Sequence, residues 1–137
     1  MRLELTRRTD LALRALHVLA GGPARQKAAE VAEKIGSTRS FVPQVVGPLV
    51  AQGWVGSEPG PTGGYSLATS LDDVSMLDLI ETSEGPTDTG RCVLVDQDCP
   101  TARRCALHEP WTRARAALMA ELAATAVSSV PPGEAPS

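Results

Sequence analysis

The chain has 137 residues, of which 42% are hydrophobic and 3% aromatic, and its formal net charge is −3 at pH 7. This length suits one domain, or one domain with an extension, around an aliphatic core. No apolar run approaches the ~18 residues of a membrane-spanning helix, and the first residues lack the apolar stretch of a signal peptide. We therefore expect a cytoplasmic protein without a membrane partner.

The charges are unevenly distributed along the chain. Residues 1–50 contain eight Lys or Arg against four Asp or Glu, whereas the remainder contains five against twelve. A basic N-terminal part on an acidic chain is typical of an N-terminal DNA-binding module, although a chance asymmetry would look the same.

Three helical segments are predicted in the first part of the chain. Thr9 is the candidate N-cap of a first helix, which the Gly-Gly-Pro run at 21–23 ends. Apolar residues recur with helical spacing over 28–35, and Gly36 closes this second helix. A third helix is expected over 40–53. Two helices joined by a glycine-containing turn form a helix-turn-helix, whose second helix reads DNA.

The start of the third helix carries the candidate DNA contacts. We expect Ser40 to be its N-cap, which places Pro43 in the first turn, where proline costs nothing. Pro48 predicts a kink, because proline removes a helical hydrogen bond. The polar side chains that could contact bases or phosphates, or could simply form a solvated surface, are Thr38, Arg39, Ser40 and Gln44.

A β-hairpin is predicted around the glycine- and proline-rich stretch 56–64. The residues Trp54-Val55 precede it and Tyr65-Ser66-Leu67 follow it. Two short strands joined by such a loop form a hairpin, and a hairpin directly after a helix-turn-helix is a wing. We include Gly63 and Gly64 among the candidate DNA-binding residues; the alternative is a plain surface loop.

Two further helices are predicted in the second half. Ser75 resembles the start of a capping box that opens a short helix over 76–82. A linker, 83–90, and a cysteine-containing loop precede a long helix over 110–127, which we expect to pack against a second copy of the chain. The expected fold class is mainly α with a small β-hairpin: a winged helix-turn-helix (1–70), a cysteine loop and dimerisation helix (71–127) and a disordered tail (128–137).

All three cysteines lie in one short loop. Their spacing is Cys92-x6-Cys99-x5-Cys105, and His108 follows. Three soft ligands this close predict a metal or metal-cluster site that leaves one position for another ligand. Three spare cysteines are the alternative, but cytoplasmic thiols in such a cluster are more often ligands or redox groups. The chain has no Cys-x-x-Cys, phosphate-binding glycine loop or paired nucleophile and base, so we do not expect an enzyme.

The order of these elements resembles the Rrf2 family of bacterial transcriptional regulators, over residues 3 to about 127. The motifs that carry the resemblance are the cysteine triplet, the wing sequence Gly63-Gly64-Tyr65-x-Leu67 and the first-helix motif Leu5-Thr6-x-x-Thr9-Asp10-x-Ala12-Leu13-Arg14-Ala15-Leu16. The resemblance implies a homodimeric repressor that binds a double-stranded DNA operator. It also implies that Cys92, Cys99 and Cys105 hold an iron–sulfur cluster that senses nitric oxide, redox state or iron supply.

The resemblance offers two candidates for the fourth ligand. In the nitric-oxide-sensitive repressors a first-helix carboxylate of the partner subunit completes a 4Fe–4S site, and Asp10 matches it. In the cluster-assembly regulators a histidine three residues after the last cysteine completes a 2Fe–2S site, and His108 matches it. The first-helix motif favours Asp10 and 4Fe–4S, although the x6 gap is one residue longer than in either group.

Ordinary structural roles remain open for both residues, since Asp10 suits the first turn of a helix and His108 precedes one. A thiol- or zinc-dependent redox regulator of the same fold is the alternative function. In the DNA-reading parts the chain departs from the family: the stretch 57–60, Ser-Glu-Pro-Gly, stands where an arginine is common at the base of the wing.

Overall fold

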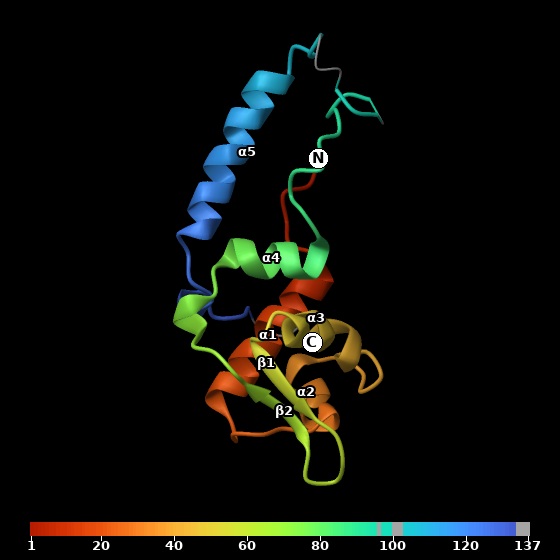
Figure 1. The fold of residues 1–137 in the computed structure, drawn as a ribbon, viewed down its shortest axis with the longest axis vertical. Coiled ribbons are helices and arrows are strands. Elements are labelled where there is room, and N and C mark those ends of the chain that lie inside the picture. The colour runs from red at the N-terminus through yellow and green to blue at the C-terminus, as the bar shows by residue number, and fades with distance from the viewer. Residues whose placement is uncertain (96, 100–102, 134–137) are drawn as a thin grey trace.

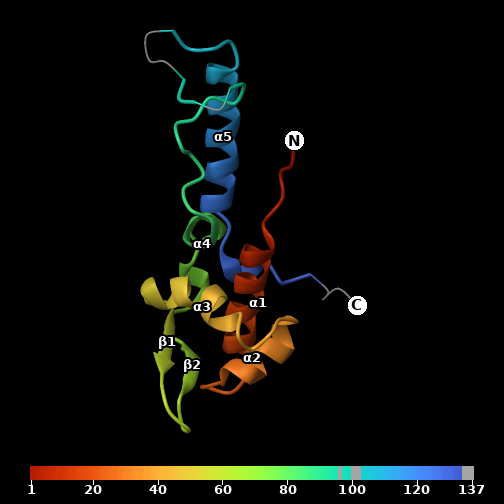
Figure 2. The same cartoon turned by 90° about the vertical axis from the view of Figure 1, so that its right-hand side faces the viewer.

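The computed structural model describes residues 1–95, 97–99 and 103–133. Figures 1 and 2 show a helical body from which a hairpin projects at one end, while a long helix and the cysteine segment form an arm at the other. The elements, in chain order, are α1 (Arg7–Gly21), α2 (Ala28–Ile35), α3 (Val42–Ala51), β1 (Val55–Glu58), β2 (Gly64–Leu67), the 3-10 turn η1 (Leu71–Asp73), α4 (Met76–Glu84), α5 (His108–Ala123) and the 3-10 turn η2 (Val127–Ser129).

Helix α1 is the centre of the body, and its buried side chains from Leu11 to Leu19 contribute to the core between α2, α3 and α4. The prediction that Thr9 caps this helix is wrong. The N-cap is Thr6, whose hydroxyl accepts a hydrogen bond from the Thr9 N–H at 3.3 Å. Thr9 is instead fully buried, and its hydroxyl donates to the carboxylate of Glu84 at the end of α4. The Thr9 side chain, which the local sequence suggested as the cap, thus forms a tertiary contact instead.

Helices α2 and α3 form the predicted helix-turn-helix. Helix α2 ends at Gly36, whose positive φ of 75° suits glycine. Helix α3 begins after Phe41, not after Ser40, whose hydroxyl lies 3.3 Å from that of Thr38. Pro43 lies in the first turn as expected, and α3 continues as one helix through Pro48. The kink at Pro48 stays a prediction.

The wing is an antiparallel pair in which Val55 faces Leu67 and Glu58 faces Gly64, as expected. A third segment joins it through Gln26, whose N–H donates to the Tyr65 carbonyl at 2.9 Å and whose carbonyl accepts from the Tyr65 N–H at 2.7 Å. The hairpin is therefore tied to the loop between α1 and α2.

Ser75 is the N-cap of α4, and its hydroxyl accepts a hydrogen bond from the Asp78 N–H at 3.0 Å. The helix extends two residues further than predicted, to Glu84. Helix α5 starts at His108 and ends at Ala123, earlier than expected. The chain turns there because the following segment pairs with the entry to α4: the Met76 N–H donates to the Thr125 carbonyl at 2.8 Å.

The chain after α5 packs back on the body. Val127 is fully buried, its N–H donates to the Val74 carbonyl, and its own carbonyl lies 3.0 Å from Nε2 of His17. Val130 also packs against the core. The described structure thus continues past residue 127 into the predicted tail, 128–137; residues 134–137 lie outside the described part.

Helix α5 is the most exposed of the helices. It has no buried side chain, and Leu118 retains 48% of its surface. Along the described chain, none of the helices combines the length and the apolar character needed to cross a bilayer.

Candidate metal centre and nucleic-acid interface

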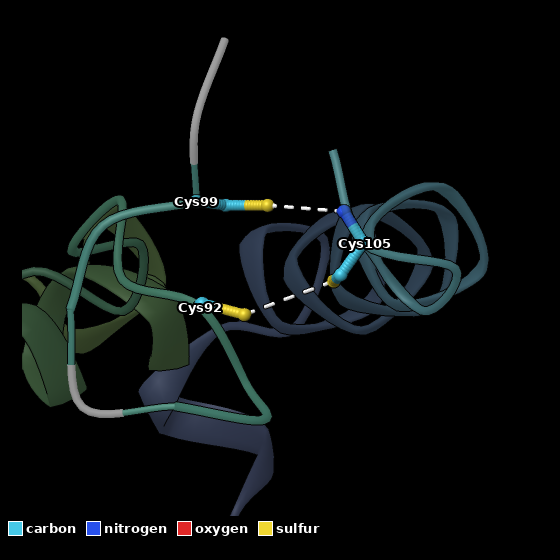
Figure 3. Close-up of side chains that lie close together, drawn as sticks. All are labelled: Cys92, Cys99 and Cys105. Carbon is cyan, nitrogen blue, oxygen red and sulfur yellow. Dashed lines mark hydrogen bonds between the residues drawn. The ribbon is translucent and has the colours of Figure 1, made fainter. Parts of the chain in front are cut away.

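The three cysteines converge on one point. The Sγ atoms of Cys92, Cys99 and Cys105 all lie within 4.8 Å of one another, and Figure 3 shows the three side chains pointing into a common space. The Cys92 N–H donates to the Gln97 carbonyl at 2.8 Å, which folds the loop back on itself. The Cys105 N–H donates to Sγ of Cys99 at 3.3 Å. Backbone hydrogen bonds therefore bring together the thiols that the sequence predicted as ligands.

Two of the thiols have different acidities. Sγ of Cys92 lies 3.7 Å from Sγ of Cys105. The backbone N–H groups of Leu94 and Val95 donate to Cys92 and lower the pKa of its thiol. Burial, and then the contact with Cys92, raise the pKa of the Cys105 thiol. In the metal-free chain Cys92 is thus the more readily ionised of this pair.

His108 lies beside this cluster in the same chain. A pocket adjoins Cys92 and Cys105, and His108 lines it at the start of α5, with Nδ1 3.4 Å from Nη1 of Arg104. The pocket is strongly charged, since Arg91 and an ion pair between Asp88 and Arg115 also line it. Among the described residues, however, the group of closely spaced ligand atoms contains the three thiols alone.

Asp10 is not brought to the cysteines within one chain. It lies in the first turn of α1, where its carboxylate forms an ion pair of 3.0 Å with Arg14. Helix α1 belongs to the body, whereas the cysteines lie at the end of the arm (Figures 1 and 2). The Asp10 side chain is 35% exposed, so it is accessible to a second subunit.

The predicted DNA contacts gather at the start of α3. Thr38, Ser40 and Gln44 line one open pocket on the surface. Arg39 is also exposed but does not line it. Arg7, which the sequence did not single out, joins this pocket and donates to the Gly36 carbonyl at 3.3 Å. Arg7 belongs to the basic N-terminal part, but charge alone could not select it from its neighbours.

Gly63 and Gly64 have a packing role in the wing. A Cβ at Gly63 would overlap the carbonyl of Glu58. A Cβ at Gly64 would lie 2.6 Å from the carbonyl oxygen of Gln26, and φ there is +139°. Both positions require glycine so that backbones can approach closely. Their contact with DNA stays a prediction.

Comparison with known proteins identifies relatives over almost the whole chain. The family model Rrf2, described as an iron-dependent transcriptional regulator, matches residues 5–131. The helix-turn-helix-type regulator ORF2 of Azotobacter vinelandii is 30% identical over 110 residues, which are 80% of this chain and 63% of that protein. The regulator IscR of Vibrio atlanticus is 30% identical over 83 residues, which are 61% of this chain and 47% of the relative. The matched segment therefore spans about half to two thirds of these curated relatives.

Solved structures share the fold. CymR of B. subtilis, the global cysteine regulator, has a TM-score of 0.70 at 26% identity, and the match covers 93% of this chain and 95% of CymR. CymR of Staphylococcus aureus has a TM-score of 0.66 at 25% identity, with 89% and 93% covered. IscR of T. potens has a TM-score of 0.63 over 92% and 84%, and its 20% identity bears on the fold alone. The predicted winged helix with a long C-terminal helix is confirmed.

Proposed function

The chain belongs to the Rrf2 family of transcriptional regulators, and from this membership we propose that it is a homodimeric, DNA-binding repressor whose three clustered cysteines hold an iron–sulfur cluster. The relatives are regulators of transcription, not enzymes, as the sequence indicated. The observation that carries the proposal is the convergence of three sulfur atoms within 4.8 Å on a chain with a helix-turn-helix and wing.

The DNA-binding half of the proposal rests on the surface at the start of α3. Polar and basic side chains on an exposed helix start can bind phosphate oxygens and base edges. Thr38, Ser40 and Gln44 lie there beside Arg7, and Arg39 is exposed next to them. A helix-turn-helix dimer binds two half-sites whose separation matches that of its recognition helices.

The dimer half of the proposal rests on α5. A helix with no buried side chain and with Leu118 48% exposed gains stability by packing against a second copy. Trp111, Met119 and Leu122 are partly exposed on the same helix. If two such arms pair in antiparallel orientation, each cysteine cluster lies near the body of the partner subunit.

The donor set fits a cluster in its chemistry. Thiolates are the ligands that iron–sulfur clusters prefer, and three cysteines leave one position for a different ligand. Cys92, Cys99 and Cys105 would hold the cluster, which when bound supplies a centre that reacts with nitric oxide or oxidants. We propose Asp10 of the partner subunit as the fourth ligand of a 4Fe–4S cluster, with His108 and a 2Fe–2S cluster as the alternative.

The position of Asp10 suggests how the site could control DNA binding. Asp10 and Arg7 lie three residues apart on α1, so they are neighbours on the helix surface. Arg7 contacts the turn of the helix-turn-helix through the Gly36 carbonyl. If the cysteine loop of one subunit holds Asp10 of the other, release of that ligand frees α1 and alters the spacing of the two recognition helices.

A thiol- or zinc-dependent version is favoured by one observation. A tetrahedral ion with metal–sulfur bonds of about 2.3 Å holds its sulfurs about 3.8 Å apart. The Cys92–Cys105 separation is 3.7 Å, which suits two thiolates on one metal atom, either a zinc ion or one iron of a 2Fe–2S cluster. A 4Fe–4S cluster places its cysteines on different irons, so these sulfurs would have to separate when it binds.

Anaerobic purification of the full chain separates these versions. We expect a coloured protein that contains iron and acid-labile sulfide, with Mössbauer spectra that identify the cluster type. A colourless protein that contains zinc would establish the zinc-dependent version. A protein without any metal would support the version in which the cysteine thiols themselves are the redox sensor. Gel-shift assays against a library of genomic fragments test the DNA-binding half separately.

A further inference from the structure

The wing of this protein carries a single charged side chain, and that side chain is an acid. Between residues 52 and 71 Glu58 is the sole charged residue of the sequence. Its carboxylate is 63% exposed. A hairpin whose only charged side chain is a carboxylate is repelled by the phosphates of a duplex. The charge that attracts DNA to this end of the molecule must therefore come from another segment.

The segment before α2 is fixed against the wing. Gln26 pairs with Tyr65 through two backbone hydrogen bonds of 2.9 and 2.7 Å. Its side chain is fully buried and donates to the Val18 carbonyl at 2.9 Å. In extended backbone successive side chains alternate between faces. Arg25 and Lys27, on either side of the buried Gln26, are both exposed, and their contacts place them next to the hairpin.

Both of these cations contact the wing loop. Arg25 donates to the Thr62 carbonyl at 3.2 Å and forms an ion pair of 3.2 Å with Glu58. Lys27 donates to the Pro61 carbonyl. Arg25 remains 43% exposed, and Lys27 is exposed as well. A guanidinium has five N–H donors and an ammonium three, so these contacts leave donors for a ligand.

We propose that Arg25 and Lys27, the wing cations, bind backbone phosphates of DNA and give the wing the positive charge that its own sequence lacks. This inference rests on the proposed DNA-binding function. The wing loop holds both side chains in place, so little side-chain entropy remains to be lost on binding. Glu58 orients Arg25 but opposes DNA, so it lowers affinity while it positions a cation.

Salt-dependent binding to non-specific DNA tests this without knowledge of the operator. The probe is a fluorescein-labelled duplex of mixed sequence, about 30 base pairs long, titrated with the full-length protein at about 50–200 mM salt. Each phosphate contact contributes about 0.9 to the slope of log K against log salt. Loss of one contact that leaves the affinity at 1 M salt unchanged therefore weakens binding about eightfold at 0.1 M salt. We expect a loss of this size for Arg25→Gln and for Lys27→Gln.

Three further variants sharpen the test. Glu58→Gln is expected to tighten binding, because it removes the opposing charge and leaves both cations. Lys27→Arg is expected to retain the slope of the unmodified protein. Arg2→Gln removes the same charge from a side chain that is 87% exposed. It lies in the N-terminal segment, whose end is far from the hairpin (Figure 1), and its replacement should leave the slope unchanged.

The outcomes distinguish the wing cations from the function as a whole. An unchanged slope for Arg25→Gln and Lys27→Gln overturns the inference, whether or not the melting temperature falls, because the two residues then only brace the loop. Weaker binding by Glu58→Gln overturns it as well. If the unmodified protein binds no duplex at any salt concentration, the proposed DNA-binding function itself fails, and the inference fails with it.

Discussion

Replacement of Asp10 by Asn tests whether the metal centre is shared between subunits. An amide has nearly the shape of a carboxylate but is a much weaker ligand for iron, so the helix should persist while the site loses its fourth ligand. We expect Asp10→Asn, reconstituted anaerobically with iron and sulfide, to hold its cluster weakly and with an altered visible spectrum. His108→Asn should retain the spectrum of the unmodified protein.

The structural cost of Asp10→Asn is small, so cluster loss cannot be mistaken for unfolding. Asp10 forms a partly exposed ion pair with Arg14, 3.0 Å long, and lies in the first turn of α1. Such an ion pair contributes about 0.2–1 kcal/mol and a first-turn acid about 0.3–1 kcal/mol. The two losses together amount to about 0.5–2 kcal/mol, so the metal-free variant should unfold about 2–8 °C below the unmodified metal-free protein. Thermal melting monitored by circular dichroism measures this difference.

A heterodimer decides whether Asp10 acts on the partner. One subunit carries Asp10→Asn and the other carries Cys99→Ser, with different affinity tags so that only the mixed dimer is isolated. If Asp10 completes the partner's site, one of the two sites in this dimer has all three cysteines together with the carboxylate, and half the cluster content returns. No cluster in the mixed dimer, or cluster loss with His108→Asn but not Asp10→Asn, would refute the assignment.

Three other predictions concern positions that the structure explains. Thr9→Val removes the partly buried hydrogen bond to the end of α4 and should lower the free energy of unfolding in urea by about 1–3 kcal/mol. A loss below about 0.5 kcal/mol would mean that this contact contributes little to stability. Gly64→Ala places a Cβ 2.6 Å from a backbone carbonyl oxygen at a φ of +139° and should lower the free energy of unfolding by about 2 kcal/mol or more. Gly60 also has a positive φ but lies in open space, so Gly60→Ala should lower it less. Equal losses for the two variants would contradict the packing argument. The pKa of the Cys92 thiol is lowered and that of the Cys105 thiol is raised. In reduced, metal-free protein iodoacetamide should therefore alkylate Cys92 at a lower pH than Cys105. Mass spectrometry of the modified peptides measures the order of alkylation, and the reverse order would contradict the prediction.

The fold could be predicted from the sequence because its signals are local. The apolar spacing of α2 and the glycine after it define a helix and its end, and the glycine-rich stretch between two short strands defines the wing. The cap of α1 could not be predicted in this way. Thr6 and Thr9 are both acceptable N-caps, and the choice depends on Glu84, which is far away in sequence and accepts from the Thr9 hydroxyl.

The candidate site likewise has a part that the local sequence predicts and a part that depends on tertiary contacts. The residue types and close spacing of the cysteines were sufficient to predict that they converge. The sequence could not predict the contacts that side chains make with segments far away in the chain. Arg7 donates to the Gly36 carbonyl in the turn after α2, and Arg25 donates to the Thr62 carbonyl in the wing. Each of these contacts joins segments that are far apart in the sequence, so no local periodicity or motif predicts them.

The position of α1 explains how a remote cluster could act on DNA in the proposed switch. The cysteines and the wing lie at opposite ends of the molecule (Figures 1 and 2), so a signal that stayed within one subunit would have to cross the whole body. Helix α1 packs against α2, α3 and α4, and its first turn carries both Asp10 and Arg7. A ligand supplied from α1 to the partner's cysteines places the signal within one helical turn of the Arg7–Gly36 contact. The proposed shared site would therefore replace a long path through one subunit with a short path between two subunits.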